Sequence, residues 1–307
     1  MDERLRLAGR KDNLWRRARI IQMIRDFFIG RGYLEIETPC RIPSPAPEAH
    51  IDAFASGEWF LHTSPELCMK RVLAAGYPKI FQICRCFRMS ERGSRHLPEF
   101  TLLEWYRSGV DYIGLMEECE DLILSVLRGL TGENSISYQG VCIDLEKPWE
   151  RIRVEDVFSR FASMSLERAL AMGAFDEIMA FEIEPRLSRR KPVFLYDYPV
   201  SLGALARVGE RNPSFAERFE LYISGIELVN AFSELTDAVE QRARFSKEQR
   251  ERLSRGKTVY PDAEKFLECL CHMPESAGAA LGVDRLVMIL SDAAGVEDVV
   301  AFTPEEL

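Results

Sequence analysis

Apolar residues recur at the spacing of one helix face between positions 14 and 32. These residues are Ile20, Met23, Ile24, Phe27 and Phe28. Gly30 and Gly32 favour the end of a helix, so the pattern predicts an amphipathic helix over residues 14–32. Residues 33–38 alternate apolar and acidic side chains and predict a half-buried strand that ends at a proline. Residues 43–47, with a proline at each end, predict a loop.

Two later segments, residues 79–88 and 99–107, are rich in aromatic and branched side chains and have the pattern of extended strands. The segment between them, residues 89–98, is polar and contains Gly93, which favours a turn. Together the three segments predict a long antiparallel hairpin.

The rest of the chain predicts helices and strands in blocks. Helices are expected at residues 112–130, 154–172, 237–255 and 283–290, a strand pair at 218–234, and single strands at 193–198 and 277–282. Residues 133–188 indicate little beyond helical packing. This order favours an α+β fold in which helices flank an antiparallel sheet. Because no repeat or low-complexity linker interrupts the pattern, we expect one domain over residues 1–307.

Composition narrows the function classes. The 307 residues are 47% hydrophobic, enough for a large core, and carry a formal net charge of −9. That charge opposes broad electrostatic attraction to a nucleic-acid backbone. No apolar run approaches the roughly 20 residues that span a bilayer, and the first twenty residues are rich in arginine. We therefore expect a cytoplasmic protein without a membrane segment.

The eight cysteines include two pairs at a spacing of two, Cys84 with Cys86 and Cys269 with Cys271. In a strand this spacing places both thiols on one face. A zinc site would need a second matched pair or nearby histidines, and the chain has four histidines in all. Reduced core cysteines are therefore the expectation.

The hairpin carries the first candidate chemistry. Residues two apart in a strand share a face, which puts Phe100, Leu102, Glu104 and Tyr106 on one side of the second arm. Arg88 ends the first arm beside a loop that carries further basic residues: Arg92, Arg95 and His96. Such a cluster suits a nucleotide triphosphate or a carboxylate, although a solvated hairpin tip would have the same composition.

Carboxylates interrupt the apolar segment 219–232 and its flanks: Glu220, Glu227, Glu234 and Asp237. Buried carboxylates are costly unless paired or metal-bound, so these residues suit magnesium held against phosphates. The alternative is that these carboxylates form the polar outer face of a sheet edge and bind no metal. Asn230 and Phe232 could present an amide and a ring to a ligand. In segment 278–285 small residues allow a flat ligand to approach the backbone, and Arg285 could stack on adenine or contact phosphate.

Taken together, these features resemble the three signature motifs of class II aminoacyl-tRNA synthetases over residues 14–303. Motif 1 resembles residues 16–39, which form the dimer interface in that family. Motif 2 resembles residues 87–100, and motif 3 resembles residues 278–290. The segments 63–66, 103–106 and 225–237 are similar to the lysine-specific branch.

The resemblance implies a role for each matching residue. Ser64, Glu66 and Glu104 would hold the amino end of the substrate, and Arg88 its carboxylate and the α-phosphate of ATP. Tyr106 and Glu234 would receive the side-chain ammonium, and Asn230 would line the pocket. On the nucleotide side, Phe100 and Arg285 would sandwich adenine beside His96, while Glu220 and Glu227 would coordinate Mg²⁺. Arg88 and Arg285 are the expected catalytic residues.

Only thirteen residues precede the first predicted helix, so we expect no anticodon-binding domain and no stable recognition of a tRNA anticodon. This truncated form resembles the family of elongation factor P β-lysine ligases. Ala280 stands where lysyl-tRNA synthetases usually have glycine, and that methyl group is associated in the family with preference for (R)-β-lysine over lysine. The implied acceptor is elongation factor P, and the implied assembly is a homodimer.

Motif 2 departs from the family pattern at Met89, Ser90 and Leu97. The glutamate missing at position 90 normally accepts a hydrogen bond from the adenine amino group, a role that Glu91 or backbone groups could take. Three alternatives to a β-lysine ligase stay open at this point. They are an α-lysine-adenylating paralogue with another acceptor, a non-catalytic regulatory protein on the same fold, and a minimal tRNA-charging enzyme.

Overall fold

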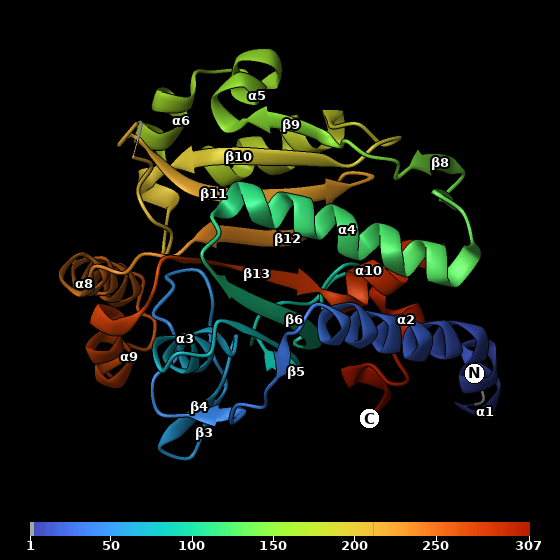
Figure 1. Ribbon diagram of the computed structural model, residues 1–307, viewed down its shortest axis with the longest axis horizontal. Helices are drawn as coiled ribbons and strands as arrows, with labels where there is room; N and C mark the ends of the chain where they lie inside the picture. The colour runs from blue at the N-terminus through green and yellow to red at the C-terminus, as the bar shows by residue number, and fades with distance from the viewer. Residues whose placement is uncertain (1–2, 211) are drawn as a thin grey trace.

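A computed structural model describes residues 3–210 and 212–307. Within these residues, one sheet of eight strands runs through the molecule in the order β1-β5-β6-β13-β12-β11-β10-β9 (Figure 1). The six strands from β5 to β10 pair antiparallel, and β1 and β9 add one parallel strand at each edge. The bounds are β1 Leu34–Glu35, β5 Lys79–Phe87, β6 Glu99–Ser108, β9 Glu150–Arg153, β10 Val193–Pro199, β11 Phe215–Ile223, β12 Ile226–Ser233 and β13 Ser276–Gly282.

Ten α-helices lie in the described ranges, together with two small sheets. The helices are α1 Glu3–Gly9, α2 Lys11–Gly30, α3 Glu66–Ala74, α4 Tyr112–Thr131, α5 Val154–Phe161, α6 Leu166–Met172, α7 Phe175–Ile178, α8 Ala238–Ser254, α9 Glu264–Cys269 and α10 Val283–Leu290. The small sheets contain β2 Arg41–Ile42, β4 Trp59–Leu61 and β3 Ala55–Ser56, and separately β7 Ser135–Tyr138 and β8 Val141–Asp144.

Helices α2, α4 and α10 cover one face of the sheet and form the main core with it (Figure 1). Alternate residues of the strands point into this core, among them Phe81, Leu103, Trp105, Val229 and Leu281. Because successive side chains of a strand point to opposite faces, the residues between these positions lie on the other face. That second face carries most of the polar residues singled out in the sequence.

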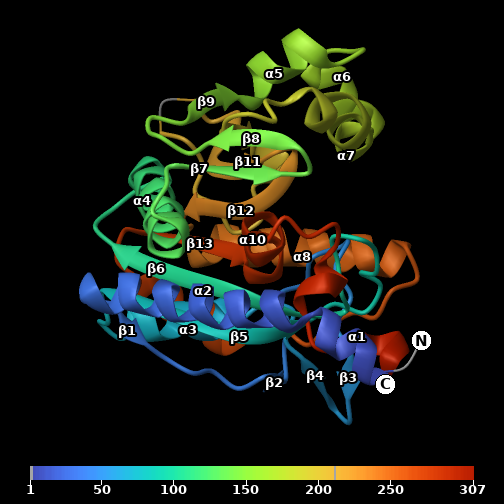
Figure 2. The same ribbon diagram turned by 90° about the vertical axis from the view of Figure 1, so that its right-hand side faces the viewer.

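Two further groups of helices leave part of the second face open. Helices α3, α8 and α9 pack with Tyr106 and Leu205 in a second cluster. Helices α5, α6 and α7 gather at the β9 edge of the sheet, as Figures 1 and 2 show. Along the described residues, no helix is long and apolar enough to cross a bilayer.

Most predicted elements are confirmed, including the helix near residues 14–32, the hairpin and the strand pair. Three predictions are wrong in part. Segment 33–38 contributes only the two-residue strand β1. The helix expected at 154–172 is two helices, because the Ser165 side chain caps a new helix at the Arg168 amide. Segment 133–188 also contains the strands β7, β8 and β9, whose short polar sequences gave no clear alternation.

Candidate active site

The register of the sheet aligns the predicted site residues in one row. Glu104 of β6 lies opposite Ala280 of β13, Ala280 opposite Asn230 of β12, and Asn230 opposite Glu220 of β11. On the other side of Glu104, the row continues to Gln82 of β5. Directly opposed residues of a sheet share a face, so this row forms a polar floor on the second face of the sheet.

The neighbouring row explains why one glycine is required. Tyr106 lies opposite Gly278, and Gly278 opposite Phe232. A Cβ atom at Gly278 would come within 2.3 Å of the Tyr106 ring and 2.6 Å of Glu234 Oε1. Both distances are far inside van der Waals contact, so the absence of a side chain allows the ring and the carboxylate to meet over β13.

Glu104 is held in place by two hydroxyl groups. Tyr106 Oη donates to its Oε2 at 2.7 Å, and Ser64 Oγ donates to its Oε1. The same Ser64 hydroxyl accepts the amide N–H of Glu66 at 3.0 Å, which fixes the start of α3 and brings Glu66 to the site. The structure therefore brings together four of the five residues predicted to hold the amino end of a substrate and its side-chain ammonium.

Lys70 was not identified from the sequence, yet its ammonium lies at the centre of this group. Its Nζ is 2.5 Å from Glu66 Oε1 and 2.5 Å from Glu234 Oε2, and it lies 4.9 Å from the centroid of the Phe232 ring. Only 2% of the side chain is exposed. The available signal was its position four residues after Glu66, which places both side chains on one face of a helix.

Acidic groups outnumber the cation in this pocket. Burial raises the pKa of Glu104 to about 8, with the negative charge of Glu66 adding to the effect. Burial also raises the pKa of Glu234 to about 8, although Lys70 opposes the shift. No hydrogen-bond donor from the described residues reaches Glu234 Oε1. Three carboxyl groups thus lie in a pocket whose ammonium pairs with two of them, Glu66 and Glu234, so the pocket favours a ligand that brings positive charge.

A cavity of about 280 Å³ opens beside this pocket. Its lining contains most residues assigned to the nucleotide and the substrate carboxylate: Arg88, His96, Phe100, Glu227 and Arg285. Asn230 and Ala280, predicted to lie in the substrate pocket, line it as well. The Arg88 guanidinium lies 5.0 Å from the centroid of the Phe100 ring, and its Nη1 is 3.3 Å from Glu91 Oε1. Four arginines, Arg88 and Arg285 among them, thus line one cavity with the Phe100 ring, an arrangement that suits a nucleotide polyphosphate.

Contacts across the cavity orient Arg285. Its Nη1 donates to the Glu227 carbonyl at 2.7 Å, and its Nη2 donates to His96 Nε2 at 2.5 Å. Burial and the positive charge of Arg285 lower the pKa of His96, so the ring is neutral and accepts this bond. The arginine of α10 and the histidine of the hairpin loop therefore meet, although 189 positions separate them.

Glu220 and Glu227 lie near a third carboxylate, Glu184. Burial and the charges of Glu227 and Glu220 raise the pKa of Glu184 to about 7. Burial also raises the pKa of Glu220, and Glu227 contributes to that shift. The charge of Glu227 thus contributes to the raised pKa of both Glu184 and Glu220, and carboxylate oxygens are the hard ligands that Mg²⁺ prefers. The donor set therefore fits the predicted magnesium site.

Protein groups already orient Glu220. Tyr198 Oη and Tyr222 Oη each donate to its Oε2 at 2.6 Å, and Arg218 Nη2 lies 2.5 Å from its Oε1. Arg218 also donates from Nε to Asn230 Oδ1 at 3.0 Å. Sequence patterns did not single out Arg218, although it precedes Glu220 by two residues in a strand and therefore shares its face.

Glu48 is a second lining residue that the sequence did not indicate. It belongs to the loop after β2 and faces the cavity together with Arg88. Burial raises the pKa of Glu48 to about 7. A loop glutamate among prolines has no periodic signal, so its position depends on the tertiary fold alone.

Comparison with known proteins agrees with this geometry. The family model of class II tRNA synthetases (D, K and N) matches residues 4–306. The chain belongs to this family. The match confirms the predicted fold class, and class II membership makes the protein a ligase of the synthetase type.

Two curated relatives narrow the position within the family. The elongation factor P–(R)-β-lysine ligase of Enterobacter sp. (strain 638) is 39% identical over 309 residues, which span 95% of this chain and 94% of the relative. The ligase of the same name from Salmonella gallinarum (strain 287/91 / NCTC 13346) is 40% identical over 311 residues, with the same two shares. The chain therefore groups with these ligases inside the class II family, as the sequence predicted.

Proposed function

We propose that the protein uses ATP to adenylate (R)-β-lysine and then transfers the β-lysyl group to a lysine side chain of elongation factor P. The names of the relatives support this reaction. The observation that carries it is the pocket of Glu66, Glu104 and Glu234. Lys70 pairs there with Glu66 and Glu234, while the hydroxyl groups of Ser64 and Tyr106 hold Glu104. A substrate with two ammonium groups supplies the charge that this pocket lacks.

In the first step, the substrate carboxylate attacks the α-phosphate of ATP, and pyrophosphate leaves. Arg88 binds the carboxylate and the α-phosphate, while Arg285 and Phe100 hold the adenine from opposite sides. Mg²⁺ held by Glu220 and Glu227 would neutralise phosphate charge. The protein contributes position and electrostatic stabilisation, since in-line transfer to phosphorus needs no covalent intermediate with a side chain.

In the second step, the ε-amine of the acceptor lysine attacks the carbonyl carbon of the adenylate, and AMP leaves. Attack requires the neutral amine, so the rate falls as the pH drops below the pKa of that amine in the complex. Elongation factor P would dock where a synthetase receives tRNA. This proposal does not involve stable recognition of an anticodon.

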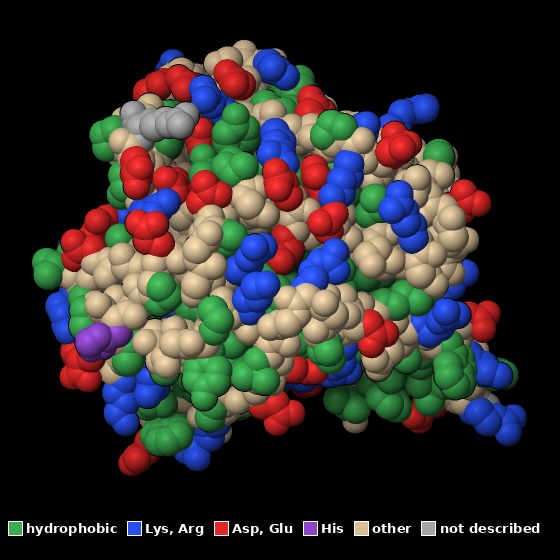
Figure 3. All heavy atoms as spheres, viewed as in Figure 1, with side chains coloured by type: hydrophobic (Ala, Val, Ile, Leu, Met, Phe, Trp, Pro, Cys, Tyr) green, Lys and Arg blue, Asp and Glu red, His purple; other side chains and the backbone are tan. Residues whose placement is uncertain are grey.

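Charge distribution favours a protein acceptor over tRNA. The net charge of −9 opposes a polyanionic partner. On the face in Figure 3, basic and acidic side chains are interspersed instead of being grouped by sign. The proposal includes a cytoplasmic location, as expected from the sequence.

The homodimer is also a proposal. Large apolar side chains are exposed in the segment that resembles motif 1, where Ile29 is 57% exposed and Leu34 48%, and Trp15 directly before it is 66% exposed. A second copy of the chain would cover them, because the same segment forms the dimer interface in the family. Exposed apolar groups on one segment favour such an interface.

Adenine recognition differs from the family pattern at the hairpin loop. Glu91 lies in the cavity lining and pairs with Arg88 at 3.3 Å. The Glu91 carboxylate can accept a hydrogen bond from the adenine amino group. It would then take the role of the glutamate that usually stands at position 90. We propose this substitution of roles for Glu91.

ATP/pyrophosphate exchange tests the adenylation step. The purified protein should catalyse exchange with (R)-β-lysine and much less with α-lysine or without an amino acid. Arg88→Ala should abolish exchange, because the substrate carboxylate and α-phosphate lose their shared cation. Faster exchange with α-lysine would instead favour the α-lysine paralogue, and no exchange with either amino acid would favour a regulatory role.

Ala280 offers a selectivity test on the same assay. It lies between Glu104 and Asn230 in the polar row, so its methyl group takes space on the pocket floor. Ala280→Gly should raise exchange with α-lysine relative to (R)-β-lysine by about tenfold, the usual effect of one methyl group in a pocket. An unchanged ratio would show that another residue determines the preference.

A further inference from the structure

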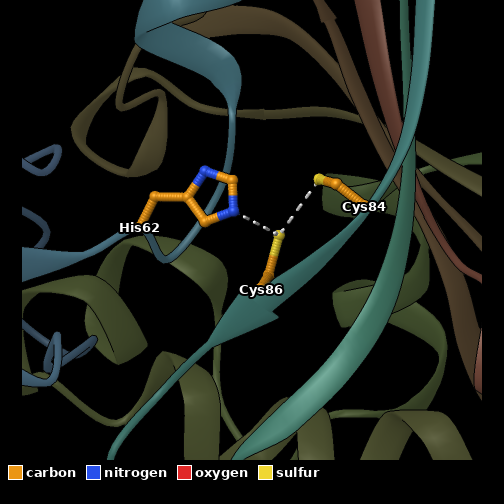
Figure 4. Close-up of side chains that lie close together, drawn as sticks. All are labelled: His62, Cys84 and Cys86. Carbon is orange, nitrogen blue, oxygen red and sulfur yellow. Dashed lines mark hydrogen bonds between the residues drawn. The ribbon is translucent and has the colours of Figure 1, made fainter. Parts of the chain in front are cut away.

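Three potential metal ligands lie together on the same face of the sheet as the proposed active site. His62 directly follows β4, and Cys84 and Cys86 belong to β5 (Figure 4). The two sulfur atoms are 3.8 Å apart, and Nε2 of His62 is 4.0 Å from Sγ of Cys86. All three ligand atoms lie within 4.8 Å of one another.

The spacing of the two sulfur atoms matches a tetrahedral site. With zinc–sulfur bonds of about 2.3 Å, two thiolates of a tetrahedron lie about 3.8 Å apart. A set of two thiolates and one imidazole leaves a fourth position for water, as in open zinc sites. The sequence argued against zinc because no histidine stood near the cysteine pair. In the fold, His62 lies beside this cysteine pair and supplies the missing histidine.

His62 has unused bonding capacity. Its side chain is 1% exposed, and Nδ1 has no hydrogen-bond partner among residues 3–210 and 212–307. Nε2 lies 2.6 Å from the carbonyl oxygen of Arg85, to which it donates in the metal-free protein. A shift of the ring proton to Nδ1 frees Nε2 for a metal. Metal binding therefore competes with one hydrogen bond, which suits a reversible site more than a permanent one.

The cluster is connected to the proposed active site through consecutive residues. The Thr63 carbonyl accepts from Arg88 Nε at 3.4 Å, and the Ser64 hydroxyl donates to Glu104. Any movement of His62 toward a metal therefore displaces the groups that orient Arg88 and Glu104. Arg88 is also two residues from Cys86 and directly follows the same strand.

We propose that His62, Cys84 and Cys86 bind one thiophilic d¹⁰ cation, represented by Zn²⁺, and that its binding slows adenylation. The two thiols release their protons as the two metal–sulfur bonds form, and no electron is transferred. The binding itself is independent of the proposed function, whereas the effect on rate rests on it.

Titration with Co²⁺ tests the binding, because tetrahedral cobalt thiolates have intense absorption bands. One equivalent should produce these bands, and Zn²⁺ should remove them. Cys84→Ala and Cys86→Ala should each weaken binding by about 100-fold, since each removes a ligand. Cys142→Ser, which changes an exposed thiol on β8, should leave binding unchanged. Absent bands, or bands that persist in both alanine variants, would overturn the proposal.

Pyrophosphate exchange with and without Zn²⁺ tests the effect on rate. One equivalent of Zn²⁺ should slow exchange about tenfold, a chelator should restore it, and Cys84→Ala should be insensitive. Cobalt binding with an unchanged rate would overturn the regulatory part and leave a metal site. If exchange is absent under all conditions, the proposed adenylation fails while the cobalt result still decides the metal site.

Discussion

The ammonium of Lys70 lies between the carboxylates of Glu66 and Glu234 and is almost fully buried. Removing one partner of a buried ion pair leaves the other charge without compensation. Lys70→Met should therefore lower the free energy of unfolding by about 3 kcal/mol, measured by urea denaturation. As a control, Arg242→Gln breaks an exposed ion pair with Glu264 and should leave stability within experimental error. Equal effects of the two variants would contradict the central role of Lys70.

The raised pKa values of Glu104 and Glu234 predict proton release on substrate binding. Both groups have a pKa of about 8, mainly because of burial, and are largely protonated at pH 7. An incoming ammonium favours the ionised form, so binding should lower both pKa values and release protons. Calorimetry at pH 7 in buffers of different ionisation enthalpy measures this release.

The pH dependence and the Glu104→Gln variant test whether Glu104 and Glu234 release these protons. It should diminish above pH 8, where both groups are already ionised before binding. It should also decrease in Glu104→Gln, which removes one of the two titrating groups. Proton uptake, or a release that is independent of pH, would contradict the assignment of the pocket to a cationic substrate.

At the scale of elements, β13 shows how one strand controls the site. A Cβ atom at Gly278 would meet the Tyr106 ring at 2.3 Å and Glu234 Oε1 at 2.6 Å. Gly278→Ala should therefore reduce exchange at least about 100-fold by displacing Tyr106 and Glu234. Gly9→Ala, at a position in α1 where a Cβ atom would meet nothing within 4 Å, is the control and should retain most of the activity. Similar rates for both variants would show that the packing over β13 is not needed.

Periodicity alone predicts the elements that bury an apolar face. The helix α2 and the hairpin of β5 and β6 have long, regular patterns, and both occur where the sequence placed them. The alternation in β6 also correctly placed Glu104 and Tyr106 on one face. The short edge strand β9 has no such pattern, because parallel pairing with β10 and not local propensity determines it.

Contacts between distant segments could not be predicted in this way. Lys70 meets Glu234 across 164 positions. His62 meets the Cys86 thiol because its own carbonyl accepts from the amide of Phe87, which ends β5. The resemblance to class II synthetases supplied roles for residues such as Arg88 and Arg285, which the periodic pattern could not provide. Those roles remain predictions for individual residues, while the family is established.

At the scale of the whole molecule, an acidic pocket and a cavity lined with arginine lie side by side on one face of the sheet. The pocket suits a cationic amino acid and the cavity suits ATP. The central claim is that this arrangement transfers a β-lysyl group to another protein. Mass spectrometry of intact elongation factor P, incubated with the protein, ATP, Mg²⁺ and (R)-β-lysine, tests it most directly. We expect the mass of elongation factor P to increase by one β-lysyl group. The increase should require every component and should be lost with Arg88→Ala. An unmodified elongation factor P despite rapid pyrophosphate exchange would contradict the proposed transfer.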